Sequence, residues 1–438
     1  MQKGRIDVIT MGCSKNLIDS ERLMKRLASL GYQVEHDSDN PEGEYVVVNT
    51  CGFIGDAKEE SINMILDLAR LKQEGRIGKL VIMGCLSERY RNELPEELPE
   101  VDVWYGKFDW KDFIDKLPPA KKDHKKKDIR SWERTLTTPP WSAYIKVSEG
   151  CDRMCAYCAI PLITGRHTSR EIEEILEEVR SLVKEGVKEF NIIAQDLSSY
   201  GRDLYGSGKL PELVEKIAET EGVEWIRLHY LYPTDFPMGI LDVMNRHDNV
   251  CKYIDIALQH ISDDVLSAMN RKITKEETLK LLKEIREKVP GIRIRTTVMT
   301  GFPEEGEEQF EELKEFVKSQ KFERLGGFAY SEEEDTLGAR ALEDSIPSEV
   351  KDKRLSEIMS IQEEIAEELN HKDIGKKFKV LVEGKTDGML FGRTEFDSPE
   401  VDQEVIIEEG DAEPGEFVEV EITGAGTFDL QGRIIRKL

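Results

Sequence analysis

Three cysteines lie close together in the middle of the chain, at Cys151, Cys155 and Cys158. Their C-x3-C-x2-C spacing follows a predicted strand, so one short loop can present three thiolates to one soft-metal centre. A 4Fe–4S cluster normally binds four cysteine thiolates, so three ligands leave one iron with an open position. Structural zinc usually takes four ligands as paired C-x2-C units, and only His167 is near enough in sequence to complete such a site. The spacing therefore favours a reactive iron–sulfur cluster.

Three further cysteines, Cys13, Cys51 and Cys85, are far apart in sequence but occupy equivalent places. Each follows a predicted strand (IDVITMGC, YVVVNTC and KLVIMGC), and a glycine adjoins each of them. In a parallel sheet all three emerge at the carboxyl-end edge, where open α/β folds bind ligands. Three ordinary core thiols are the alternative, but the repeated placement favours a second cluster. The seventh cysteine, Cys251, has no partner pattern and fits a core thiol.

The elements that must position these cysteines predict an α/β protein of three parts. Residues 1–120 alternate strands and amphipathic helices, which predicts a doubly wound parallel sheet. The predicted strands are Arg5–Thr10, Tyr45–Thr50, Lys79–Met83 and Val101–Tyr105, and the predicted helices are Asp19–Leu30, Ala57–Gln73 and Ser87–Leu94.

Residues 138–370 repeat the alternation six times, which predicts an open, partial (β/α) barrel with its working residues at the carboxyl ends of the strands. The predicted strands are Ala143–Val147, Glu189–Ala194, Trp225–Tyr230, Tyr253–Leu258, Ile292–Met299 and Arg324–Tyr330, with long helices such as Ser169–Glu185 and Lys275–Lys288. Residues 372–438 show five short β-patterned runs separated by Gly, Asp and Pro, which predicts a small antiparallel β-barrel.

A linker is predicted at residues 121–137, within a Pro- and Lys-rich stretch that includes Arg130 and Arg134. This stretch fits either a solvated connection or a local contact to an acidic partner such as rRNA or tRNA. The chain as a whole carries 88 acidic and 62 basic residues, a net charge of −26 that weighs against general nucleic acid binding. With no long apolar segment and an odd number of cysteines, we expect a cytoplasmic protein without membrane attachment.

The central cysteine loop, with Tyr157 before its third cysteine, resembles the signature of the radical S-adenosylmethionine (SAM) superfamily. The resemblance implies that the open iron chelates SAM, and that one electron cleaves it to methionine and a 5′-deoxyadenosyl radical. It also implies cosubstrate contacts from later strand ends, although each segment alone would fit an ordinary loop. The implied SAM contacts are Tyr157, Gln195, Asp196, Ser262, Asp263 and Gly301.

Two three-cysteine centres, a partial barrel and a small terminal barrel together resemble the methylthiotransferase family over essentially the whole chain. The resemblance implies an amino-terminal methylthiotransferase domain, a radical SAM domain and a carboxy-terminal TRAM domain, with two 4Fe–4S clusters. One SAM would methylate the sulfur handled at the second cluster, and another would generate the radical that activates an unreactive carbon. A reductant such as flavodoxin or ferredoxin is implied as well.

Within that family, the local motifs are similar to the branch that modifies the β-carbon of an aspartate in small-subunit ribosomal protein S12. The motifs are Gly12–Asn16, Asn49–Ile54, Gly84–Tyr90, Leu258–His260 and the acidic Tyr330–Asp335. Between Glu395 and Glu421 there are twelve acidic residues and no Lys or Arg, which suits a basic ribosomal protein, either free or on the ribosomal subunit, better than tRNA. A merely solvated acidic surface would show the same pattern.

Three other functions fit parts of the pattern. One is a tRNA adenosine methylthiotransferase, another is an iron–sulfur electron carrier or scaffold, and the third is a zinc-stabilised RNA-binding module. The sequence also departs from many relatives after Ile160-Pro161, because Thr164 precedes Gly165 where those relatives carry arginine. That departure affects the contact of one loop and leaves the cysteine ligands in place.

Overall fold

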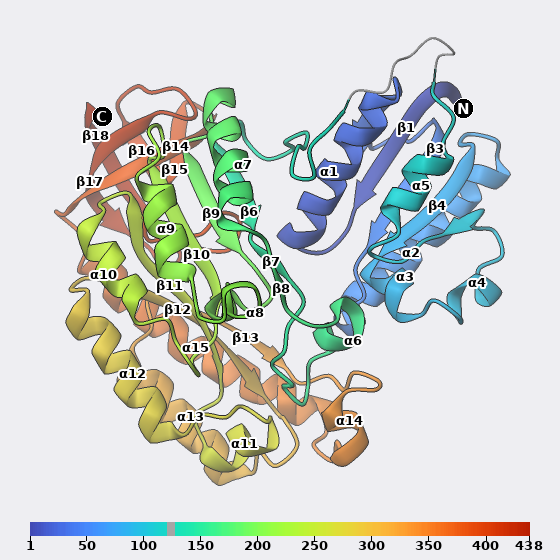
Figure 1. The fold of residues 1–438 in the computed structure, drawn as a ribbon. Coiled ribbons are helices and arrows are strands. Elements are labelled where there is room, and N and C mark those ends of the chain that lie inside the picture. The colour runs from blue at the N-terminus through green and yellow to red at the C-terminus, as the bar shows by residue number, and fades with distance from the viewer. Residues whose placement is uncertain (121–127) are drawn as a thin grey trace.

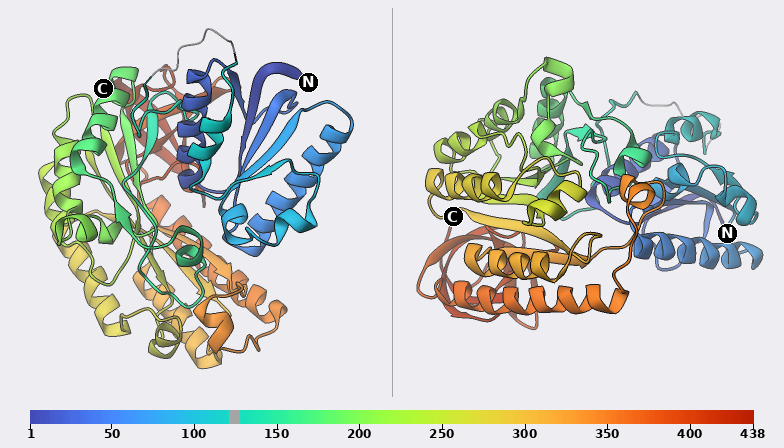
Figure 2. Two further views of the ribbon diagram at one scale, coloured as in Figure 1. Left: turned by 45° about the vertical axis from the view of Figure 1, so that its right-hand side comes forward. Right: turned by 90° about the horizontal axis from the view of Figure 1, so that it is seen from below.

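Two parallel sheets and one closed barrel organise the chain in the computed structural model, which describes residues 1–120 and 128–438 (Figure 1). The amino-terminal sheet lies beside the central sheet, and the barrel packs at the opposite end of the central sheet (Figures 1 and 2). No helix in the described ranges is long and apolar enough to cross a membrane. The predicted domain boundaries at 1–120, 121–137, 138–370 and 372–438 stay predictions.

The amino-terminal sheet has the strand order β2-β1-β3-β4-β5, with every pairing parallel. Its strands are β1 (Gln2–Thr10), β2 (Gln33–His36), β3 (Gly43–Thr50), β4 (Lys79–Gly84) and β5 (Val103–Trp104). Helices α1 (Ser14–Ser29) and α5 (Trp110–Lys116) cover one face and α2 (Gly55–Gln73) covers the other, so each face has its own apolar core. The predicted doubly wound sheet is therefore confirmed, although β2 and α5 were not predicted.

The helix predicted at Ser87–Leu94 is instead two short helices, α3 (Cys85–Arg89) and α4 (Leu94–Glu97). Tyr90 leaves the helical conformation with φ −113° and ψ 41°, and Pro95 lies in the first turn of α4, where its missing N–H costs no intrahelical bond. Helix α3 begins at Cys85 itself, directly after the end of strand β4.

The central sheet has the order β13-β12-β11-β10-β9-β6, again with every pairing parallel. Its strands are β6 (Ser142–Lys146), β9 (Glu189–Ile193), β10 (Trp225–Leu231), β11 (Val250–Gln259), β12 (Arg293–Thr300) and β13 (Arg324–Ala329). The sheet is open, which confirms the predicted partial barrel. Its outer face packs against helices α7 (Ile172–Glu185), α9 (Leu210–Ala218), α10 (Gly239–Arg246), α12 (Lys275–Lys288) and α13 (Glu307–Gln320).

Helix α7 begins three residues later than predicted, because Thr168–Ser169 form strand β8 and pair with β7 (Ser148–Glu149). The backbone N–H and the hydroxyl of Ser169 both donate to Asp203, which holds this segment outside the helix. This small ribbon leads directly into the central cysteine loop.

Five strands close the carboxy-terminal barrel in the order β14-β15-β16-β18-β17. They are β14 (Lys377–Thr386), β15 (Met389–Thr394), β16 (Glu404–Glu409), β17 (Phe417–Ala425) and β18 (Asp429–Lys437), and α15 (Ser348–His371) precedes them. The prediction of a wholly antiparallel barrel is wrong at one pairing, since β16 and β18 run parallel. A closed ring with an odd number of strands requires at least one parallel neighbour pair.

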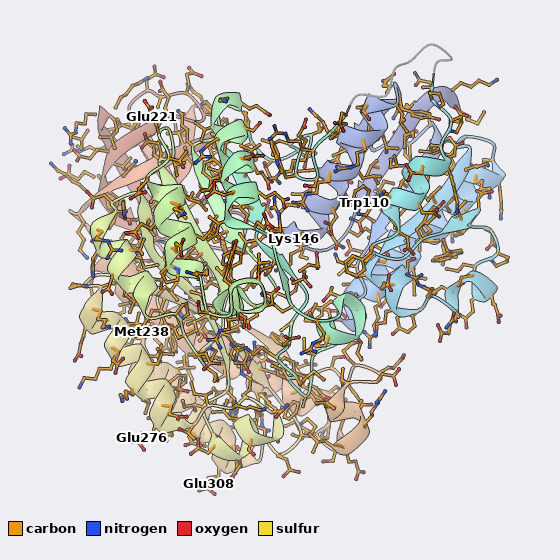
Figure 3. The ribbon with its side chains drawn as sticks, in the orientation of Figure 1. Trp110, Lys146, Glu221, Met238, Glu276 and Glu308 are labelled. Atoms are coloured by element: carbon orange, nitrogen blue, oxygen red, sulfur yellow. The ribbon has the colours of Figure 1, made fainter. Side chains whose placement is uncertain are left out.

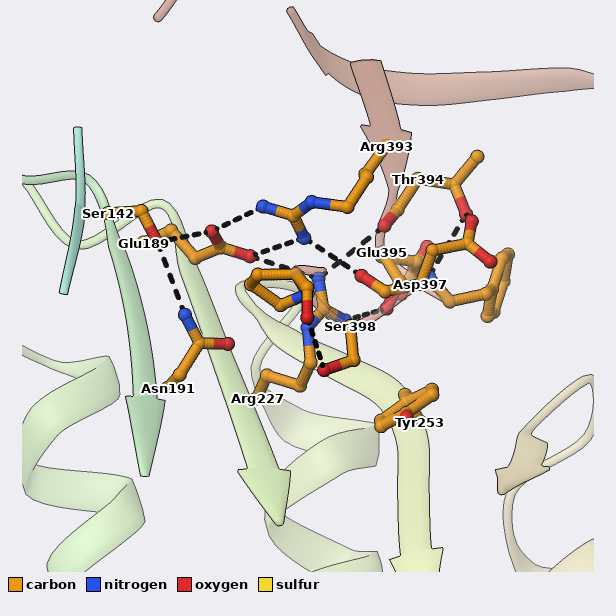
Figure 4. A network of polar contacts seen from close by, with 12 residues as sticks. Ser142, Glu189, Asn191, Arg227, Tyr253, Arg393, Thr394, Glu395, Asp397 and Ser398 are labelled. Carbon is orange, nitrogen blue, oxygen red and sulfur yellow. Dashed lines mark hydrogen bonds and ion pairs between the residues drawn. The ribbon is translucent and has the colours of Figure 1, made fainter. Parts of the chain in front are cut away.

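Buried ion pairs attach the barrel to the inner face of the central sheet (Figure 4). The carboxylate of Glu189 on β9 accepts from Arg393 of the barrel at 2.8 Å and from Arg227 on β10 at 3.1 Å. Burial raises the pKa of Glu189, but the opposing effect of Arg393 and Arg227 is larger, and the resulting pKa is about 2. The buried charges of Glu189 and Arg393 are thus paired only when the barrel is packed against the sheet, which fixes the position of the barrel.

The acidic run of the barrel is less free than its sequence predicts. Asp397 and Asp402 pair with Arg324 and Arg295 of the central sheet. Other members of the run pair within the barrel, namely Glu416 with Lys437, Glu419 with Arg436 and Glu421 with Arg433. These five of the twelve acids in the run therefore balance basic residues of the same chain.

The lysines at 121–127 of the predicted linker lie outside the described residues, and so does any partner contact that they would make. Arg134 is described and contradicts a solvated linker, because its side chain is buried and pairs with Glu21 on α1 and Glu178 on α7. Arg130 pairs with Glu177 at the surface. This part of the linker therefore connects the two sheets through ion pairs.

Candidate active site

The central cysteine loop runs from β7 to α6 (Ile160–Thr164), at the carboxyl ends of the central strands. Cys151 and Cys155 are buried and Cys158 is half-buried. Burial, with smaller contributions from the nearby Asp196 carboxylate and the Cys155 thiol, raises the pKa of the Cys151 thiol to about 12. Burial also raises the pKa of the Cys158 thiol, so a bound cationic centre would supply the charge that favours the thiolate form of Cys151 and Cys158.

No three His, Cys, Asp or Glu side chains within residues 1–120 and 128–438 converge as ligands of one metal ion. A 4Fe–4S cluster makes a different demand, because each cysteine binds a different iron atom of the cluster. The donor set, three thiolates on one loop without a fourth ligand, fits a cluster that keeps one iron open.

A buried arginine and two tyrosines surround this loop. Nη1 of Arg271 lies 3.8 Å from the Cys155 sulfur and donates to the Tyr157 hydroxyl at 3.3 Å. The Tyr232 hydroxyl lies 3.5 Å from the same sulfur, and the Arg271 guanidinium lies 4.1 Å from the Tyr232 ring centroid. Neither Arg271 nor Tyr232 was predicted, since no spacing rule connects either residue to the cysteines. Hydrogen bonds and positive charge near cluster sulfurs tune such centres.

Gln195 and Asp196 lie beside the loop, as their position at the end of β9 predicts. One oxygen of Asp196 accepts from Arg153 of the loop at 2.8 Å and from Ser199, while its other oxygen is buried without a hydrogen-bond partner. The Gln195 amide donates to Glu149, and its buried oxygen also lacks a partner. Buried acceptors are normally satisfied, so these two atoms fit the amino group of a polar cosubstrate.

The remaining predicted cosubstrate residues are more dispersed. Ser262 is buried at the start of α11 (Asp263–Ala268), and the carboxylate of Asp263 accepts from the backbone of Lys275 at 2.6 Å. Gly301 has φ +71°, and its N–H donates to Glu305 at 2.9 Å. Their roles toward SAM stay predictions.

The amino-terminal cysteines come together at the carboxyl ends of three adjacent strands, β1, β3 and β4. Cys13 is exposed, Cys51 is buried and Cys85 is half-buried. Gly12, with φ +91°, lies against Cys51 so closely that a Cβ there would be 2.8 Å from the Cys51 sulfur. Asn16 holds the loop by donating to the carbonyl oxygens of Met11 and Thr50. The strand order therefore brings these three thiols to one edge of the sheet.

A buried charge network connects the amino-terminal sheet to the central loop. Lys107 donates to Asp19 at 2.9 Å, Lys146 donates to Asp19 and to Glu149 at 2.7 Å, and Glu149 in turn accepts from Gln195. Figure 3 labels Lys146 at the junction of the two sheets. Burial raises the pKa of Asp19, but Lys107 and Lys146 lower it well below its ordinary value. The network therefore orients the two cysteine triads relative to each other.

A second junction involves the acidic segment Tyr330–Asp335. Glu333 is buried and accepts from Lys58 of α2 at 2.9 Å and from Arg89 of α3 at 2.6 Å. Glu333 therefore neutralises cations of the amino-terminal region.

Three family models match consecutive parts of the chain. The uncharacterized protein family UPF0004 matches residues 5–106, the radical SAM superfamily matches residues 145–317, and the TRAM domain matches residues 374–435. A relative from Phocaeicola vulgatus, named ribosomal protein uS12 methylthiotransferase RimO, is 59% identical over 99% of this chain and 100% of its own length. The chain belongs to the RimO family. A RimO relative from Bacteroides thetaiotaomicron is 58% identical over the full length of both chains, and one from Flavobacterium johnsoniae is 48% identical.

Solved structures show the same fold outside the RimO family. TsrM from Kitasatospora setae, a radical SAM methyltransferase with cobalamin and a 4Fe–4S cluster bound, has a TM-score of 0.53 and 15% identity over 75% of this chain and 72% of its own. OxsB, a cobalamin-dependent SAM radical enzyme, has a TM-score of 0.51 and 12% identity over 82% of this chain and 56% of its own. At these identities the likeness concerns the fold alone.

Proposed function

We propose that this member of the RimO family inserts a methylthio group at the β-carbon of an aspartate in small-subunit ribosomal protein S12. The observation that carries the proposal is the pair of cysteine triads, each at the carboxyl edge of its own sheet and joined through the network from Lys107 to Glu149. An unpolarised C–H bond cannot be activated by acid–base groups or nucleophiles, so radical chemistry has to come from a cofactor.

The cofactors that fit are two 4Fe–4S clusters and SAM, with two SAM molecules consumed in each turnover. Cys151, Cys155 and Cys158 would hold one cluster, and the amino-terminal triad would hold the other. When bound, these groups supply the radical that removes hydrogen and the sulfur that replaces it.

The chain's own residues orient these groups and exclude water from them. The unpartnered oxygens of Gln195 and Asp196 accept from the cosubstrate's ammonium group, while Arg153 holds Asp196 in place. Tyr157 packs edge to face on Phe302, with ring centroids 6.4 Å apart, and closes the apolar side of the loop. Arg271 keeps a positive charge beside the Cys155 sulfur in this enclosed site.

The substrate would dock as a basic protein in the cytoplasm, either free or within the small ribosomal subunit. Exposed acids of the barrel that form no ion pair within the described chain provide a complementary charge, namely Glu404, Glu408, Glu409 and Glu413. A low-potential donor such as flavodoxin or ferredoxin would deliver the electron.

A paired anaerobic assay tests the proposal. The reconstituted enzyme receives reductant, sulfide and SAM with either a peptide from the aspartate loop of protein S12 or unmodified tRNA, and mass spectrometry follows both. We expect a methylthio mass gain on the peptide alone. A gain on tRNA alone would overturn the assigned substrate, and a gain on neither, with deoxyadenosine released, would leave only the radical SAM activity.

A further inference from the structure

One lysine reaches from the amino-terminal triad to the central sheet without an acidic partner. Lys15 follows Cys13 by two residues, and its ammonium nitrogen lies 3.2 Å from the ring centroid of Tyr230, on β10. A cation over an aromatic face is held in place while its full charge is kept. In the described ranges, 1–120 and 128–438, no carboxylate forms an ion pair with this ammonium.

Most of the neighbouring cations pair with carboxylates, unlike Lys15. Lys107 and Lys146 share Asp19, as described above, and Arg153 pairs with Asp196. Lys58 and Arg89, at the second junction, both pair with Glu333. An anion that enters between the triads therefore meets, beside the exposed Cys13, the Lys15 ammonium, which has no carboxylate within ion-pair distance in residues 1–120 and 128–438.

The platform under Lys15 is rigidly built. Tyr230 has φ +63°, a left-handed backbone that is rare and strained for an aromatic residue. Its N–H donates to the buried carboxylate of Asp255 at 3.2 Å, and Asp255 is itself 3.5 Å from Arg295. Strain of this kind persists where the surroundings over-determine the backbone, and it concentrates at ligand sites. The Tyr230 side of the site thus holds the lysine in one place.

We propose that Lys15 binds the side-chain carboxylate of the substrate aspartate, an inference that rests on the proposed function. In a polypeptide the backbone around the target is neutral, so the side chain carries the one charge adjacent to the reacting carbon. A carboxylate held by Lys15 places the β-carbon, one bond away, next to Cys13 and the sulfur-bearing triad. The same contact selects aspartate over asparagine, which has the same shape without the charge.

Binding measurements test this without relying on turnover. Fluorescence anisotropy of a labelled loop peptide from protein S12 compares the Asp peptide with its Asn counterpart on the reconstituted holoenzyme. We expect the wild type to prefer the Asp peptide by about 10- to 100-fold. Lys15→Met should reduce Asp-peptide affinity to that of the Asn peptide, whereas Lys15→Arg should keep most of the preference. Lys3→Met, at an exposed lysine of strand β1, is the control and should change neither affinity.

Equal weakening of both peptides by Lys15→Met, or no preference in the wild type, would overturn the assignment. Iron content and circular dichroism check that the variant is assembled, and Lys15→Gln provides a second neutral side chain if the methionine variant is not. Methylthio insertion is measured in parallel to separate the two proposals. A Lys15-dependent preference without any insertion by the wild type would sink the proposed reaction alone, and insertion by Lys15→Met with unchanged KM would sink the Lys15 assignment alone.

Discussion

The central triad comes from one loop, Cys151–Cys158, whereas the amino-terminal triad comes from three strand ends spread between Cys13 and Cys85. The first triad is surrounded by Arg271 and tyrosines, and two of its three cysteines are buried. The second has an exposed member and a lysine beside it. A closed centre suits the generation of a radical, and an open one suits sulfur transfer to an incoming chain.

The two constructions also differ in what they need from the rest of the fold. A loop brings its thiols together by local geometry, so it requires only the ends of β6 and β7 to be fixed. The amino-terminal triad exists only when β1, β3 and β4 pair in register, since each strand contributes one ligand. Assembly of the second cluster should therefore be more sensitive to changes in its sheet.

The largest expected effect separates the roles of the triads. Cys151→Ala should abolish both deoxyadenosine release and methylthio insertion, because it removes a ligand of the radical centre. Cys51→Ala should spare deoxyadenosine release and abolish insertion. Chromatography of deoxyadenosine and mass spectrometry of the peptide measure the two outcomes. Deoxyadenosine release at the normal rate from Cys151→Ala would contradict the assignment of the central loop.

A glycine substitution tests the topological construction of the amino-terminal triad. Gly12→Ala should lose about four of about eight iron atoms per chain, because the added Cβ would lie 2.8 Å from the Cys51 sulfur. Gly4→Ala is the matched control, because Gly4 in strand β1 also has a positive φ, +74°, but has nothing within 4 Å of an added Cβ. The control should keep its iron and lose only about 1–2 kcal/mol of stability to backbone strain. Equal iron loss in both variants would attribute the effect to β1 in general.

A smaller effect is expected from Arg271→Met at the central triad. The substitution removes the guanidinium beside the Cys155 sulfur and the donor to the Tyr157 hydroxyl. Losing a charge-assisted contact of this kind should slow deoxyadenosine release about 10- to 100-fold. Iron bound at the amino-terminal triad should be unchanged in Mössbauer spectra, and Arg271→Lys should be intermediate. A rate equal to that of the wild type would show that the arginine only fills space.

Both cysteine triads could be predicted from the sequence, but for different reasons, because one lies on a single loop and the other on three strand ends. The central spacing is local, so it is readable directly, and the amino-terminal set is readable because strands in a parallel sheet end at one edge. The six central strands and five barrel strands were placed from their apolar runs, with small shifts at their ends. The parallel pairing of β16 with β18 was not predicted, as it follows from ring closure rather than from any local pattern.

The residues around the triads were much less predictable. Arg271 and Lys107 reach their sites from distant segments, and nothing in their immediate sequence distinguishes them from surface cations. The free acidic charge of these segments was overestimated, because a count of charges cannot show that Asp397, Asp402 and Glu333 pair with cations of the same chain. Pairing across a fold depends on tertiary placement, which composition does not encode.

The smallest expected effect tests whether the two triads act as one unit. Glu333→Gln weakens the clamp that Lys58 and Arg89 form with the central region, at a cost of about 1–3 kcal/mol in the domain junction. Each triad should keep its iron, since no ligand is touched. More deoxyadenosine should be released per methylthio group inserted, by a few-fold, because the radical then forms while the sulfur site is less well aligned. Glu332→Gln, an exposed neighbour, is the control and should leave the ratio unchanged. If Glu333→Gln also leaves the ratio unchanged, alignment rests on the Lys107–Asp19–Lys146 network alone.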